Sequence, residues 1–179
     1  MNKLPQITLA FWVMKICATT LGETAGDLLS MTLNVGYAVS SMLLISVFVL
    51  TLLTQLSSKT YNPVLYWLVI LSTSTAGTTL SDFMDRTLGL GYATGSLILV
   101  SILVAIFALW KWSGESLNVN QVQSRRGEMF YWMAILFSNT LGTALGDYLA
   151  DDSGLGFAGG ALFIGATIGV VVLARYFSN

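Results

Sequence analysis

Long stretches without any charged side chain dominate this sequence of 179 residues. Each stretch can form a helix of roughly 20 residues or slightly fewer, the length that crosses the hydrocarbon core of a bilayer. The stretches are 28–58, 60–81, 87–110, 129–146 and 153–174. A further apolar segment near the N-terminus contains Lys15, Glu23 and Asp27 but is otherwise similar. The pattern predicts an all-α membrane protein with six transmembrane helices, at approximately 6–29, 36–56, 62–83, 90–111, 129–148 and 155–176.

The composition excludes several classes of function. Only 9% of the residues are charged, against about a quarter in a soluble domain. A net charge of -1 leaves no basic surplus for binding nucleic acid. Cys17 is the only cysteine and histidine is absent, which excludes thiolate or imidazole metal clusters and His-dependent triads. We therefore expect the lipid bilayer as a partner, no nucleic acid, no cofactor and no enzymatic activity.

Three segments, which begin at Phe11, Tyr66 and Tyr131, align with each other without a gap. The matching positions are Trp12, Trp67 and Trp132; Thr20, Thr75 and Thr140; Gly22, Gly77 and Gly142; Asp27, Asp82 and Asp147; Gly36, Gly91 and Gly156; and Tyr37, Tyr92 and Phe157. Each copy is one helix, a short turn and a return helix, so every copy enters the membrane from the same side. We predict three parallel two-helix hairpins at 1–60, 61–112 and 129–179, with a cytoplasmic linker at 113–128.

The loop charges differ between the two sides of the predicted membrane protein. The side with both termini holds Lys3, Lys59, Lys111, Arg125, Arg126 and Arg175, with Lys15 near it, whereas the opposite side has only Arg86. The positive-inside rule therefore places both termini in the cytoplasm. Trp12, Trp67 and Trp132 are expected at the inner boundary, in an aromatic belt. The N-terminal apolar stretch is part of a repeat, so we expect a retained helix rather than a cleaved signal peptide.

One face of the first helix in each repeat is polar. The positions seven and four residues before each repeat aspartate share its face, because helical neighbours recur at these spacings. The stripe consists of Thr20, Glu23 and Asp27; Thr75, Thr78 and Asp82; and Thr140, Thr143 and Asp147, with Thr19, Ser74 and Asn139 extending it inward. Parallel repetition puts the three aspartates at one depth, in the outer part of the membrane, where we expect them to converge around a shared axis.

The ligand chemistry of this stripe favours a hard cation, because Mg²⁺, Ca²⁺, Mn²⁺ and Na⁺ prefer oxygen ligands. We predict Glu23, Asp27, Asp82 and Asp147 as metal ligands, with the Thr and Asn side chains as support. Four carboxylates suit a divalent ion better than a monovalent one. Without a bound ion, crowded carboxylates favour taking up a proton, so exchange of a cation for protons is the expected mechanism.

The remaining acids on the outer side are expected to be solvated. Asp85, Asp151 and Asp152 lie at the predicted outer turns and are candidates for an outer vestibule that concentrates cations. Glu23 breaks the symmetry of the repeat, because its equivalents are Thr78 and Thr143. The first hairpin is therefore expected to differ chemically from the other two.

Each of these features also has a structural interpretation. An aspartate at the end of a membrane helix can cap a turn at the headgroup boundary. Gly22 with Gly26, and Gly142 with Gly146, have the small-xxx-small spacing that lets helices approach closely. The alternative function is therefore a non-transporting membrane scaffold or accessory subunit. The Gly-Asp dipeptides also suggest an intramembrane aspartyl protease, but that chemistry needs paired acids at mid-membrane depth.

The strings TTLGETAGD and SNTLGTALGDYLADDSGLG resemble a family of bacterial inner-membrane proteins known as uncharacterised membrane-anchored proteins, with repeated T-x-G-x-x-x-x-D two-helix hairpins. The resemblance covers nearly the whole chain and implies a multi-pass protein of the bacterial inner membrane. Family members often carry a further hairpin, so association into a homo-oligomer is an additional expectation. The residues themselves favour an integral membrane transporter of a hard divalent cation of the Mn²⁺, Mg²⁺ or Ca²⁺ class, with export coupled to proton entry.

Overall fold

The computed structural model describes residues 5–117, 122 and 124–177, so Lys3 and part of the predicted linker lie outside the described residues. The described chain is helical, without strands. Its α-helices are α1 Leu9–Asp27, α2 Tyr37–Ser57, α3 Pro63–Asp82, α4 Tyr92–Trp112, α5 Arg125–Asp147 and α6 Gly156–Phe177. The predicted helix boundaries agree with these to within about one helical turn.

The turn of each hairpin has the same structure. The first helix of a repeat ends at the repeat aspartate and continues into a five-residue π-helical turn: η1 Leu28–Thr32, η2 Phe83–Thr87 or η4 Tyr148–Asp152. The return helix then starts at a glycine with positive φ, which is 82° at Gly36, 72° at Gly91 and 66° at Gly156. Other residues are strained in this conformation, which explains why glycine recurs at this position of the repeat.

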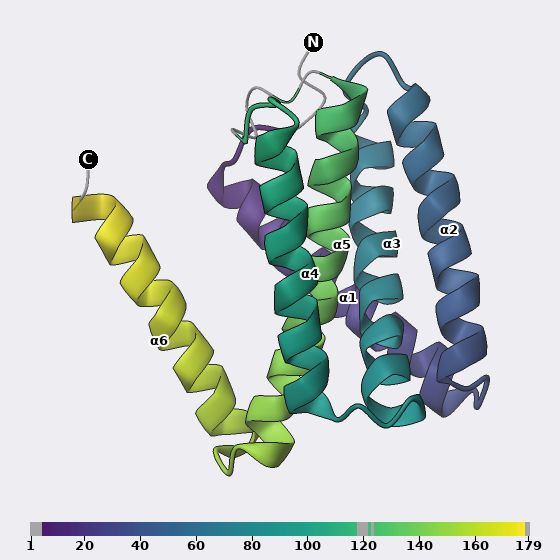
Figure 1. Ribbon diagram of the computed structural model, residues 1–179, viewed down its shortest axis with the longest axis vertical. Helices are drawn as coiled ribbons and strands as arrows, with labels where there is room; N and C mark the ends of the chain where they lie inside the picture. Colours follow the sequence, from purple (N-terminus) through teal and green to yellow (C-terminus); the bar gives the residue numbers. More distant parts are fainter. Residues whose placement is uncertain (1–4, 118–121, 123, 178–179) are drawn as a thin grey trace.

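Helix α3 of the second repeat lies at the centre of the packed helices. Helices α1 and α5, which are its equivalents in the other repeats, both pack against α3 but make little contact with each other. Each of the first two return helices packs against the first helix of the following repeat, so α2 contacts α3 and α4 contacts α5. Helix α6 contacts mainly η4 and extends away from the other helices (Figure 1). The three repeats therefore form an open array rather than a ring around one axis.

An aromatic cluster forms the core at the end opposite the hairpin turns. The hydroxyls of Tyr66 and Tyr131, which are repeat equivalents, are 3.0 Å apart. Trp132 is fully buried, with its ring centroid 5.4 Å from that of Tyr66. The prediction of an aromatic belt at the membrane boundary is therefore wrong for Trp132, and Trp67 is half-buried. Trp12 alone of the three is mostly exposed, because α1 lies at the edge of the helix array.

The end of the predicted linker belongs to helix α5. The Ser124 side chain accepts a hydrogen bond from the Gly127 amide at 2.8 Å, which caps the helix start about one turn earlier than predicted. Glu128 is buried and accepts a hydrogen bond from Gln55 of α2 at 3.3 Å. This end of the linker therefore packs against the other helices and is not exposed to solvent.

Four helices of the described chain are long and apolar enough to cross a membrane: Tyr37–Ser57, Pro63–Thr87, Tyr92–Trp112 and Gly156–Ala174. Helices α1 and α5 are not among them because charged and other polar residues lower their mean hydropathy, and in α5 the polar residues include Ser138 and Asn139. The charged residues in α1 are Lys15, Glu23 and Asp27, and α5 contains Arg125, Arg126, Glu128 and Asp147. The less apolar helices are thus the ones that carry most of the predicted site.

Two of the three repeated glycines that precede the aspartates permit close helix packing. A Cβ atom at Gly22 of α1 would overlap Ser74 of α3, and one at Gly77 of α3 would lie 3.1 Å from Asn139 of α5. A Cβ at Gly142 or Gly146 would meet no atom within 4 Å. The packing interpretation holds for Gly22 and for Gly26, where a Cβ atom would lie 3.3 Å from the Thr75 carbonyl oxygen. It is wrong for Gly142 and Gly146, because no helix covers that face of α5 closely.

Substitution of these repeat-equivalent glycines should separate their roles. Gly22→Val is expected to lower the free energy of unfolding by about 2–3 kcal/mol, because the side chain must displace Ser74. Gly142→Val should change it by less than about 1 kcal/mol. Chemical unfolding in mixed micelles, followed by tryptophan fluorescence, measures both. Equal losses at the two positions would show that α1 and α3 do not pack as described.

Candidate functional site

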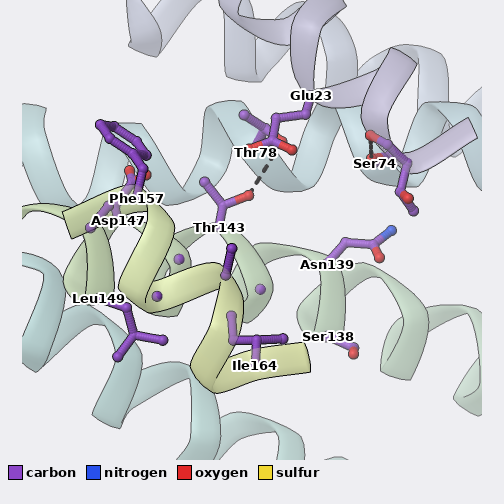
Figure 2. Close-up of a pocket in the computed structure, with 16 residues that line it drawn as sticks. Glu23, Ser74, Thr78, Ser138, Asn139, Thr143, Asp147, Leu149, Phe157 and Ile164 are labelled. Atoms are coloured by element: carbon purple, nitrogen blue, oxygen red, sulfur yellow. Dashed lines mark hydrogen bonds between the residues drawn. The ribbon is translucent and has the colours of Figure 1, made fainter. Parts of the chain in front are cut away.

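A pocket of about 390 Å³ lies between the first helices of the three repeats and α6. Its polar lining comes from Thr19 and Glu23 of α1, Ser74 and Thr78 of α3, and Ser138, Asn139, Thr143 and Asp147 of α5. Its apolar wall comes from η4 and α6 and includes Leu149, Ala150, Phe157, Ala161 and Ile164 (Figure 2). The pocket occupies the gap that remains because α1 and α5 make little contact with each other.

Two positions of the repeat contribute to the pocket from all three copies. Thr19, Ser74 and Asn139 occupy the position eight residues before the repeat aspartate, and the second position lies four residues before it. Glu23, Thr78 and Thr143 each stand four residues before the repeat aspartate, and each lines the pocket. The hydroxyls of Thr78 and Thr143 are 3.3 Å apart, and Figure 2 shows Glu23 beside them. The three repeats therefore converge at this position, with one carboxylate and two hydroxyls.

The other predicted supporting residues divide into two groups. Thr19 and Asn139 line the pocket, where the Asn139 amide donates to the Thr73 hydroxyl at 3.1 Å. Thr20, Thr75 and Thr140 lie outside the pocket lining. Thr20 is exposed, whereas Thr75 and Thr140 are buried and donate to backbone carbonyls of their own helices. Such bonds satisfy the hydroxyl proton within a helix, and neither Thr75 nor Thr140 lines the pocket.

The pocket also contains residues that the sequence did not indicate. Ser138 lines it from α5, but its repeat equivalents are Ala18 and Thr73, so no recurring polar position marks it. The apolar wall of α6 was equally unpredicted, because the return helices are uniformly apolar.

Arg86 of η2 joins two of the repeat aspartates. Its guanidinium pairs with Asp82 at 3.0 Å and with Asp147 at 3.2 Å, and it donates to the Tyr37 hydroxyl at 3.4 Å. The guanidinium carbon also lies over the rings of Tyr37 and Tyr92, at 5.9 and 5.7 Å from their centroids. Charged and aromatic groups of all three repeats thus meet at Arg86.

Sequence reasoning treated Arg86 only as an outer loop charge. A signal for its role was present, because Arg86 follows Asp82 by four residues, the spacing at which helical side chains form ion pairs. The pairing with Asp147, which comes from another repeat, had no such local signal.

The remaining predicted acids lie apart from the pocket lining. Asp27 is half-buried, and Asp151 and Asp152 are exposed in η4. Asp85 is only 5% exposed, so the expectation that it is solvated is wrong. Its carboxylate accepts a hydrogen bond from Ser81 at 3.3 Å and lies against Gly95, whose lack of a side chain leaves room for it.

The predicted metal ligands do not form one compact centre in this conformation. No group of three His, Cys, Asp or Glu side chains among the described residues is placed to hold a metal ion. Glu23 and Asp147 line the pocket, whereas Asp82 is buried against Arg86. The pocket can hold a positively charged group between its carboxylates and hydroxyls, and the Arg86 guanidinium, which is not among the lining residues, already pairs with the pocket carboxylate of Asp147.

Comparison with known proteins identifies the repeat itself. The family described as Repeat of Unknown Function (DUF347) matches residues 10–61, 65–116 and 130–179. The chain belongs to this repeat family. The three matches coincide with the three hairpins, and they omit most of the linker. No curated protein and no solved structure matches the chain.

Proposed function

We propose that this DUF347 repeat protein crosses the bacterial inner membrane six times, with both termini in the cytoplasm. Four helices have the required apolar length, and α1 and α5, with 19 and 23 residues, are long enough to complete the six. Their acids Glu23 and Asp147 line the pocket, and acids of membrane helices usually face such a cavity rather than lipid. Lys59 lies between α2 and α3, and Lys111 and Arg125 lie at the ends of α4 and α5 opposite the hairpin turns, which agrees with the positive-inside rule.

The proposed activity is transport of a hard divalent cation of the Mn²⁺, Mg²⁺ or Ca²⁺ class through the pocket. The observation that carries it is the convergence of Glu23, Thr78 and Thr143, one equivalent position from each repeat, in a pocket that Asp147 also lines. All of these ligands are oxygens, the atoms that hard cations prefer. Acids of membrane helices that face a cavity typically serve ion or proton movement.

The size of the pocket suits a partly hydrated ion. A water molecule takes about 30 Å³, so a pocket of about 390 Å³ has room for a cation and several of its waters. Glu23 and Asp147 supply the charge, and the hydroxyls of Thr78 and Thr143 bind the ion or its waters. Mg²⁺ in particular gives up its waters reluctantly and is bound through only one or two carboxylates.

Exchange for protons would complete the transport cycle. When the cation leaves, the pocket carboxylates lose their compensating charge, and protons from the outer side can neutralise them. The repeat aspartates lie at the hairpin end of the helices, which the loop charges place outside, so export of the cation against proton entry is the proposed direction.

Reconstituted protein tests the proposal. Proteoliposomes should show Mn²⁺ flux above that of protein-free liposomes, detected with an enclosed Mn²⁺-sensitive dye. Glu23→Gln should lower the initial rate about tenfold because it removes a charged ligand. Glu115→Gln, in the connection after α4, is the matched control and should retain the wild-type rate.

Two outcomes would contradict the proposal. Wild-type flux no faster than that of protein-free liposomes would exclude transport of the tested ion. Equal rates in the wild type and Glu23→Gln would exclude the pocket as the path. Tolerance of all pocket substitutions, with loss of stability only at Gly22 or Gly77, would instead favour the scaffold function.

A further inference from the structure

The Arg86 guanidinium pairs with the Asp147 carboxylate, so a cation that binds Asp147 has to compete with Arg86 for it. Arg86 holds Asp147 at 3.2 Å and Asp82 at 3.0 Å, and Asp147 also lines the pocket. Asp82 is 3% exposed, so its charge has no solvent compensation and depends on the guanidinium. Arginine stays charged in proteins, so Arg86 is a permanent positive group within the carboxylate site.

Only the second repeat supplies this cation. The equivalents of Arg86 are Met31 and Asp151, so the repeat pattern does not require an arginine at this position of the turn. Tyr37 of the first repeat and Tyr92 of the second support the guanidinium through a hydrogen bond and ring contacts. Tyr37 and Tyr92 can therefore keep the guanidinium in place when Asp147 binds another partner.

We propose that Arg86 is a tethered counter-ion that takes the place of the transported cation when the pocket is empty. This inference rests on the proposed transport function. An arriving divalent cation displaces the guanidinium from Asp147, and the guanidinium returns when the cation leaves. The empty protein then changes conformation without an uncompensated carboxylate pair, which would be costly in a medium of low dielectric constant. Because one guanidinium balances only one of the two aspartates, protons neutralise the other aspartate and Glu23.

If Arg86 is a counter-ion, its loss should slow net transport but not the exchange of one cation for another. A purely structural role would change both fluxes together. Without the guanidinium, the carboxylates of Asp82 and Asp147 bind a cation without competition, so binding becomes tighter. The empty site then carries uncompensated charge, so return of the empty protein becomes slow. Exchange of one cation for another does not need that return and continues.

The experiment compares wild type, Arg86→Gln and Arg86→Lys. Isothermal titration with Mn²⁺ in detergent gives Kd, and proteoliposomes give net Mn²⁺ uptake and exchange of radiolabelled Mn²⁺ against internal unlabelled Mn²⁺. For R86Q we expect Kd to fall about tenfold, net uptake to fall about tenfold, and exchange to stay within about threefold of wild type. R86K keeps the charge but lacks the planar fork that bridges two carboxylates, so net uptake should persist, with Kd lowered about threefold.

The outcomes distinguish this inference from the transport proposal. Absence of Mn²⁺ binding and flux in the wild type overturns both. Wild-type flux combined with an equal loss of net uptake and exchange in R86Q, or with unchanged or weaker Mn²⁺ binding, overturns the counter-ion role alone and leaves Arg86 as a structural link between repeats. If R86Q does not fold, as judged by its thermal unfolding, the R86K values decide, and an unchanged Kd overturns the role.

Discussion

Replacing Asp147 with asparagine should lower Mn²⁺ flux about 100-fold in proteoliposomes. The Asp147 carboxylate lines the pocket and also forms an ion pair with the Arg86 guanidinium, with an N to O distance of 3.2 Å. Asp147→Asn therefore removes a charged ligand and leaves Arg86 paired with Asp82 alone. The first change weakens cation binding and the second removes the counter-ion from the empty site, so the effect should exceed that of Glu23→Gln. The initial rate of dye-detected Mn²⁺ entry measures it.

Asp152→Asn provides the matched control for this substitution. Asp152 lies in η4, directly after α5, but it is exposed and does not line the pocket. Its replacement should leave the rate within about twofold of wild type, because exposed charges are screened by solvent and salt. If Asp147→Asn keeps more than half of the wild-type rate of Mn²⁺ entry, Asp147 does not take part in cation transport.

Replacing Trp132 with alanine should lower the free energy of unfolding by about 3–5 kcal/mol. The indole is 0% exposed and lies against the rings of Tyr66 and Tyr131, at centroid distances of 5.4 and 5.1 Å. Its removal leaves a cavity in the aromatic core that rigid helices cannot fill. Thermal and chemical unfolding in detergent micelles measure the loss, with tyrosine and remaining tryptophan fluorescence as the signal.

The repeat supplies its own control, because Trp12 holds the same position in the first hairpin. Trp12 is 54% exposed, so Trp12→Ala should cost less than about 1 kcal/mol. A similar loss at both positions would mean that the two hairpins bury their first helices equally, contrary to the described packing around α3.

The repeat pattern was sufficient to predict the hairpins. Three gapless copies give the same helix, turn and return helix each time, and a glycine marks the position with positive φ at the start of each return helix. Local rules therefore account for the helix boundaries. They also placed Glu23, Thr78 and Thr143 on one face, and the structure brings these residues into one pocket.

The surroundings of equivalent residues could not be predicted in this way. An alignment treats the three first helices alike, but α3 is packed on several sides whereas α1 lies at the edge. Trp132 is consequently buried while Trp12 is exposed, and Gly22 is tightly packed while Gly142 is open. These differences depend on contacts between repeats that are distant in sequence.

The same limit applies to Arg86. Its pairing with Asp82 follows a local spacing, but its pairing with Asp147 depends on η2 meeting the end of α5. Helical spacing and repeat equivalence predicted four acids in one metal centre. They did not account for the Arg86 guanidinium, which forms ion pairs with two of these acids, Asp82 and Asp147.

Anomalous X-ray scattering from a crystal of the protein grown with Mn²⁺ tests the central claim most directly. We predict an anomalous peak inside the pocket, within coordination distance of Glu23 or Asp147 or one water molecule away, on the side lined by Thr78 and Thr143. A pocket without a peak at saturating Mn²⁺, or peaks confined to the exposed acids Asp151 and Asp152, would contradict the account.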